Sequence, residues 1–173
     1  MKLLINEFIK DYKKKTTWLY FLLSFGIILL NSYFAKRQFE DGVDAVKILS
    51  GITVVAAATA TIFSLIMLAN NLSQEYSKGT IKFLYTKPKS RSAILTAKIV
   101  LAFINYIIFL VVGTVFDFVT KNYVFFKNKI GLNHLNDTIT EGYFGRTVAK
   151  QIIITNLADL AVYIFFVAMV VLV

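Results

Sequence analysis

The sequence predicts an all-α fold, a polytopic bundle of transmembrane helices that forms a single domain over residues 1–173. Composition is the first reason. Hydrophobic residues make up 57% of the chain and charged residues only 17%, and a soluble domain of this size has too little polar surface to cover so much apolar side chain. The second reason is pattern, because the apolar residues gather in four long runs with few or no charges. The bilayer is therefore the solvent that this composition fits.

Each of the four runs reaches the length of about 20 residues that a helix needs to cross the hydrocarbon core. The predicted spans lie at about residues 16–35, 48–73, 96–118 and 151–173. Helices are expected because a lone spanning strand would leave its backbone groups unpaired in lipid. The first run is expected to be a retained helix, since it is too long for a signal-peptide core and no small-residue cleavage motif follows it.

The N-terminal tail has an amphipathic pattern of its own. Leu4, Ile5, Phe8, Ile9 and Tyr12 recur at helical spacing, while polar residues occupy the opposite arc. We expect an amphipathic helix at about residues 2–14 that lies in the headgroup plane, in preference to an ordinary juxtamembrane flank.

The distribution of basic residues predicts the orientation in the cell membrane. The N-terminal tail and the segment after the second span together hold eleven lysines and arginines, whereas the other two connections hold eight. The acids Glu40, Asp41 and Asp44 also balance the cations of the first connection. Because cytoplasmic segments carry the excess of basic residues, we expect a cytoplasmic N-terminus, a cytoplasmic loop at 74–95 and an extracellular loop at 119–150.

The loop at 74–95 carries features that a plain hydrophilic connection does not need. Gly79 is suited to turn the chain at the end of the second helix, Pro88 ends a short half-apolar piece, and Ser90 can cap the helix that follows. A rigid helix-turn-helix of this kind would suit docking onto another protein. The residues singled out are Glu75, Tyr76, Ser77, Lys78, Gly79, Thr80, Pro88 and Arg91.

These residues, in this place between the second and third spans, resemble the cytoplasmic signature of bacterial type-2 ABC transporter permeases. The signature is an acid, a basic residue, Gly-Thr, and then Pro and Arg ahead of the next helix. The resemblance implies a coupling helix that docks on a separate ATPase, with Glu75 in a charged contact, Gly79 and Thr80 shaping the turn and Arg91 near the headgroups. Permeases that export antimicrobial or cytolytic peptides are the most similar members.

The resemblance implies a permease subunit of an ATP-driven ABC exporter, paired with a second permease chain and with ATPase subunits. Members usually have six spans, so we expect the last two to be missing here. The alternative interpretation is a stand-alone membrane immunity or accessory protein that needs no ATPase.

Enzymatic chemistry is not expected of the chain itself. It has no Gly-x4-Gly-Lys-Ser/Thr phosphate loop, so ATP with its magnesium would be handled by the partner and no cofactor is expected here. Cysteine is absent and histidine occurs once, so no metal site is expected. The basic residues that give the chain its net charge of +9 lie between apolar spans. This distribution indicates membrane topology and not nucleic-acid binding.

Four polar residues interrupt the apolar spans: Asn105, Asp117, Asn156 and Asp159. Asp117 is expected at the outer end of the third span. Asp159 lies well inside the fourth span, where a carboxylate costs about 2.5–3.5 kcal/mol on insertion scales, so it should face the bundle interior or a partner. Two roles stay open for Asp159, a place along the path of a cationic peptide or a structural hydrogen bond between helices.

Overall fold

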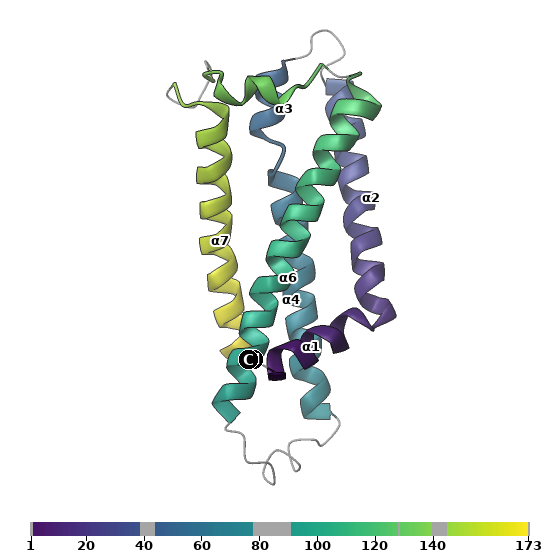
Figure 1. Ribbon diagram of the computed structural model, residues 1–173, viewed down its shortest axis with the longest axis vertical. Helices are drawn as coiled ribbons and strands as arrows, with labels where there is room; N and C mark the ends of the chain where they lie inside the picture. The colour runs from purple at the N-terminus through teal and green to yellow at the C-terminus, as the bar shows by residue number, and fades with distance from the viewer. Residues whose placement is uncertain (1, 39–43, 78–90, 128, 140–144, 173) are drawn as a thin grey trace.

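A computed structural model describes residues 2–38, 44–77, 91–127, 129–139 and 145–172, with side chains omitted at 2–3, 75–77 and 91–93 (Figure 1). Every regular element in these ranges is a helix, apart from one isolated antiparallel bridge between Thr138 and Thr147. Four helical segments of the described chain are long and apolar enough to cross a membrane. They are Lys15–Gln38, Ala45–Gln74, Ile94–Phe125 and Val148–Leu172. The prediction of an all-α fold with four long apolar helices is confirmed.

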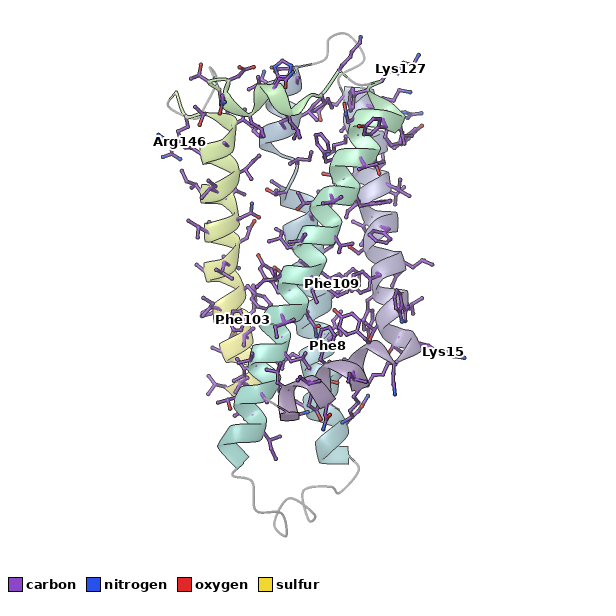
Figure 2. All side chains as sticks on the ribbon, in the orientation of Figure 1. Phe8, Lys15, Phe103, Phe109, Lys127 and Arg146 are labelled. Carbon is purple, nitrogen blue, oxygen red and sulfur yellow. The ribbon has the colours of Figure 1, made fainter. Side chains whose placement is uncertain are left out.

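The bundle has two distinct ends. Helix α1 (Lys2–Tyr12) crosses one end, which we call the α1 end, and it connects directly to the first spanning helix α2 (Lys15–Gln38) (Figure 1). The short helix α3 (Ala45–Ser50) lies at the opposite end, the α3 end. Figure 2 shows Lys15 at the α1 end and Lys127 and Arg146 at the α3 end. The membrane position of α1 remains a prediction.

The second apolar run is not one continuous helix, unlike the single span predicted at 48–73. Helix α3 ends at Ser50, and α4 (Val54–Ser77) begins after three residues with turn geometry. Gly51 is the C-cap, and the backbone N–H groups of Ile52 and Val54 donate to carbonyls three residues earlier. Glycine costs a helix interior about 1 kcal/mol relative to alanine, which weakens the helix at this point.

The third span is longer than predicted at both ends. Helix α6 runs from Arg91 to Val119 and continues as a π-helix over Thr120–Phe125, where the Phe126 N–H donates to the Lys121 carbonyl. The predicted end at residue 118 rested on the polar run that follows, but that run is buried: Thr120, Lys121 and Asn122 are all less than 8% exposed. The extracellular loop predicted at 119–150 therefore begins later, and it includes a short 3-10 helix, Leu132–Asn136.

Helices α4 and α6 form the centre of the bundle, with α2 and α7 (Val148–Leu172) on either side (Figure 1). Gly113 on α6 allows the closest approach, because an added Cβ there would lie 3.3 Å from the Ala56 side chain on α4 and 3.4 Å from Ile28 on α2. Phe21 on α2 stacks on Phe109 of α6 at 4.1 Å between ring centroids. These contacts hold α2, α4 and α6 as one packed unit.

Candidate functional site

Helices α4 and α6 bracket the hairpin that the sequence identified. Helix α4 continues to Ser77 and α6 begins at Arg91, so the connection is shorter than the loop predicted at 74–95. The side chains of Glu75, Tyr76, Ser77 and Arg91, and the whole of Lys78, Gly79, Thr80 and Pro88, lie outside the described residues. The predicted docking residues therefore remain a prediction, and the described part of the site is the base of the hairpin.

A cluster of polar groups joins α1 to α4 near this base, with Asp11 buried and Lys14 and Asn71 half-buried. The Asn71 side-chain amide on α4 donates to Asp11 Oδ2 at 2.7 Å, and Asn71 Oδ1 accepts from Lys14 Nζ at 2.7 Å. Lys14 also forms an ion pair with Asp11 at 3.1 Å, and Asp11 is only 1% exposed. We call Asp11, Lys14 and Asn71 the α1 clamp. Each of the three side chains forms hydrogen bonds with the other two.

Helix α6 is tied to the same point. Lys98 Nζ donates to the backbone carbonyl of Asn71 at 2.9 Å and lies 4.0 Å from Glu7 Oε2 on α1. The Lys98 side chain is buried at 2% exposure, although the sequence placed it among the solvated cations of the loop. A buried ammonium requires such partners, since its desolvation is otherwise costly. Lys98 thus links α6, α4 and α1.

A second contact holds the end of α1 against α6. The Tyr12 hydroxyl donates to Asn105 Oδ1 at 3.2 Å, and Asn105 is 1% exposed. Burial, followed by the neighbouring Asp11 carboxylate, raises the pKa of Tyr12 to about 12, which keeps this hydroxyl a donor at ordinary pH. Asn105, predicted as an intramembrane polar residue, therefore contacts the N-terminal helix.

At the α3 end, Asp117 is fully buried between two partners. It accepts from Lys121 Nζ at 2.7 Å and from the Ser32 hydroxyl on α2 at 3.0 Å. The sequence expected Asp117 at an outer interface and counted Lys121 among the cations of the following loop. The continuation of α6 into the π-helix corrects the expectation for Lys121, because it places this side chain inside the protein. Asp117 does lie near the end of α6, and the side of the membrane that this end faces remains a prediction.

The remaining predicted residues, Asn156 and Asp159, lie on α7, which no described polar contact ties to the α1 clamp. The Asn156 side-chain amide donates to the Ile152 carbonyl within the same helix at 2.8 Å. Both residues are half-buried. Within the described residues there is also no group of three or more His, Cys, Asp or Glu side chains that could hold a metal ion.

The sequence missed Asp11, Lys14 and Asn71 as a site. Asp11 and Lys14 appeared as ordinary members of a charged tail, and Asn71 as the end of a long span. A signal was present in the spacing, because an acid three residues before a lysine at a helix end commonly forms a pair. Nothing in the sequence placed Asn71 beside them.

The fold defines the class of protein: a multi-pass α-helical membrane protein with a hairpin of two spanning helices braced by the N-terminal helix. The chain belongs to the ABC-2 transporter family, since the sequence pattern described as ABC-2 family transporter protein matches residues 3–173. It is thus a type-2 ABC permease, a family that implies a membrane setting and an ABC ATPase partner. No curated protein and no solved structure matches the chain.

Proposed function

We propose that this chain is the membrane subunit of an ATP-driven exporter. A separate ATPase would bind the hairpin around Glu75, Gly79, Thr80 and Arg91, and a second permease chain would complete the translocation unit. The likeness of residues 71–98 to peptide exporters supports a peptide or another amphipathic molecule as the cargo. Because the chain has no phosphate loop, ATP with its magnesium would bind only in the partner.

The α1 clamp is the observation that carries this proposal. Asn71 lies six residues before the end of α4 and Lys98 seven residues after the start of α6. Both therefore stand about 10 Å from these helix ends at 1.5 Å per residue. Through Asp11, Lys14 and Glu7, both arms are joined to the N-terminal helix. A force on the hairpin would therefore move α1, α4 and α6 together.

Such a rigid connection is what coupling to an ATPase needs. A flexible hairpin would absorb the movement of the ATPase, whereas braced helices can pass it on as a rigid-body rotation of the bundle. In this proposal the α1 end faces the cytoplasm, with the N-terminus and the hairpin on the same side. The basic residues of the N-terminal tail, Lys13 and Lys15 among them, support this orientation.

Co-purification with the ATPase tests the coupling role. The chain would be expressed with a candidate ABC ATPase from the same genome, and Glu75→Lys and Gly79→Val should each reduce the amount of ATPase recovered. Asp137→Lys is the matched control, because it makes the same charge change at an exposed carboxylate at the α3 end. Unchanged recovery and unchanged export in both hairpin variants would contradict the proposal.

The alternative of a stand-alone immunity or accessory protein is not favoured by the family to which the chain belongs. The two functions differ in their need for ATP. Protection or transport that persists in cells whose ATPase carries an inactive phosphate loop would support the alternative.

A further inference from the structure

Helix α7 contacts the rest of the bundle through two separate apolar clusters. Towards the α1 end, Tyr163 and Val167 pack in a cluster with residues of α4 and α6. Towards the α3 end, Val148 packs with Ile48, Leu49 and other residues near α3. Neither cluster includes residues 153–159, and this intervening stretch carries Thr155, Asn156 and Asp159.

Buried oxygen atoms without a hydrogen-bond partner lie on α7, on α6 and in the turn between α3 and α4. Among the described residues they are Thr53 Oγ1, Tyr106 Oη, Gln151 Oε1 and Asn156 Oδ1. Thr53 and Tyr106 are only 4% and 2% exposed. The amide nitrogens of Gln151 and Asn156 already donate within α7, to Thr155 Oγ1 and to the Ile152 carbonyl. Each amide nitrogen therefore has its acceptor, whereas each amide oxygen lacks a hydrogen-bond donor.

Asp159 adds a negative charge to this set. It lies eleven residues after Val148, about 16 Å along the helix, and so near the middle of the span. Among the described residues its carboxylate makes no hydrogen bond and no ion pair, but it is close enough to the Tyr106 hydroxyl to interact with it electrostatically. An intramembrane carboxylate in this position marks a functional site by default.

Aromatic rings stand beside the carboxylate. Tyr106 stacks on Tyr163 with 4.3 Å between ring centroids, and Phe103 meets Tyr163 edge-on at 5.3 Å. Figure 2 shows Phe103 on the side of α6 that faces α7. Ring faces attract cations, and this attraction is strongest where water is excluded. We call Thr53, Tyr106, Gln151, Asn156 and Asp159 the α7 seam.

We propose that the α7 seam binds a positively charged group of the transported molecule, an ammonium or a guanidinium. The carboxylate of Asp159 would pair with the charge, and the Tyr106 hydroxyl would accept one of its hydrogen bonds. The oxygens of Asn156, Gln151 and Thr53 would receive further donors on the way to the α3 end. A donor-rich cation would satisfy both the carboxylate and the unpartnered oxygens.

Assignment of the cation to the cargo rests on the proposed function, and burial supports it. The exposed surface of α7 is apolar, with Ile153, Leu157 and Phe165 between 59% and 62% exposed. A helix of a second chain that docked there would meet these residues. Thr53, in the turn before α4, and Tyr106, on α6, are by contrast almost completely buried.

Photo-crosslinking of a defined peptide tests the proposal. The full chain is placed in nanodiscs of zwitterionic lipid, so that anionic lipid does not attract the probe. The probe is a synthetic amphipathic peptide with lysines on its polar face and one photoreactive residue. The matched probe has glutamine at each lysine position.

The lysine peptide should label the chain at least about tenfold more than the glutamine peptide, because a charge-assisted contact separates them. Asp159→Asn should abolish the difference, Tyr106→Phe should reduce it several-fold, and Asp159→Glu should retain it. The controls are Asp137→Asn and Tyr123→Phe, which make the same chemical changes at exposed positions of the α3 end. Asp159→Asn is not expected to harm folding, because an amide costs less than a carboxylate inside a membrane.

Equal labelling by the two peptides, or wild-type labelling of Asp159→Asn, would overturn the proposal. Loss of self-association in Asp159→Asn without a change in labelling would place the cation on a partner chain, and would overturn the assignment to cargo. The crosslinking needs no ATPase, so a failure here is distinct from a failure of the hairpin to recover the ATPase. The two proposals are therefore tested separately.

Discussion

The α1 clamp and the α7 seam are both polar clusters in an apolar protein, but they differ in how far their groups are satisfied. In the clamp, the Asp11 carboxylate has both Lys14 and Asn71 as partners within 3.1 Å. In the seam, Asp159 has no hydrogen bond among the described residues, and the Tyr106 hydroxyl beside it has none either. A polar cluster whose hydrogen bonds are all formed within the protein holds helices together. A cluster with unpartnered groups can instead form hydrogen bonds with a ligand.

The Asp117–Lys121 pair belongs with the clamp in this comparison. It lies at the opposite end of the bundle, but both of its members are buried and the Ser32 hydroxyl completes it. The partnered clusters thus stand at the two ends, where they fix α1 and α2 against α4 and α6. The unpartnered seam runs between α7 and these packed helices.

Removal of Asp117 should produce the largest effect. Asp117→Ala leaves the Lys121 ammonium buried without its partner, and breaking a buried pair in this way costs about 3–5 kcal/mol. The double variant Asp117→Leu with Lys121→Met should recover most of the loss, because it removes both charges. Thermal unfolding in detergent, followed by size-exclusion chromatography, measures both. Equal loss in the single and double variants would contradict the buried pair.

Loss of the clamp carboxylate should have the next largest effect. Asp11→Ala leaves the Asn71 amide without its acceptor and removes one of the two acceptors of the Lys14 ammonium, which keeps Asn71 Oδ1. The expected cost is about 1.5–3 kcal/mol for hydrogen bonds to a charged group. Hydrogen exchange of the α1 backbone should rise along with the loss of thermal stability. Lys10→Ala is the control, since Lys10 is exposed and its 3.6 Å ion pair with Glu7 should contribute little. Unaltered exchange in α1 would show that the clamp does not hold this helix.

Packing at Gly113 should matter about as much or slightly less. Gly113→Leu inserts a side chain where Ala56 and Ile28 already lie within 3.4 Å of an added Cβ, and overpacking of this kind costs about 1–3 kcal/mol. Gly26→Leu is the matched control, because a Cβ at Gly26 meets nothing within 4 Å. The difference between the two variants in thermal stability measures the close approach of α2, α4 and α6. If both variants were equally stable, the contact would be looser than the structure has it.

Asp159→Asn should have the smallest effect on stability. Whether it raises or lowers the unfolding temperature is the sharpest test of the difference between the α1 clamp and the α7 seam. Since the carboxylate has no described partner to lose, its neutralisation should leave the thermal unfolding temperature unchanged or raise it. Asp117→Asn, the same chemical change at a partnered site, should lower that temperature. A fall of similar size in both variants would mean that Asp159 has a structural partner and would remove the distinction between clamp and seam.

The sequence predicted the helical class and the four long apolar helices well. The length of an apolar run can be read directly from the sequence, and a run that crosses lipid must pair its backbone groups within a helix. It predicted a hairpin from Gly79, Thr80 and Pro88, and because those residues lie outside the described structure, this stays a prediction. It did less well at element ends. The break at Gly51 lies inside an uninterrupted apolar run, and the π-helix after Val119 lies in a polar run that hydropathy assigned to a loop.

Among the polar residues, the sequence alone determined that carboxylates lie within or at the end of the spans, and therefore that they must face protein. It did not determine which of them have partners. Asp117 has a lysine four residues later, but the helix that brings the two together was not expected to continue to Lys121. Asp159 has no such neighbour in sequence and has only the nearby Tyr106 hydroxyl. Tertiary structure decided this, because partners such as Asp11 and Asn71 are 60 positions apart in the chain and meet only when α1 packs against α4.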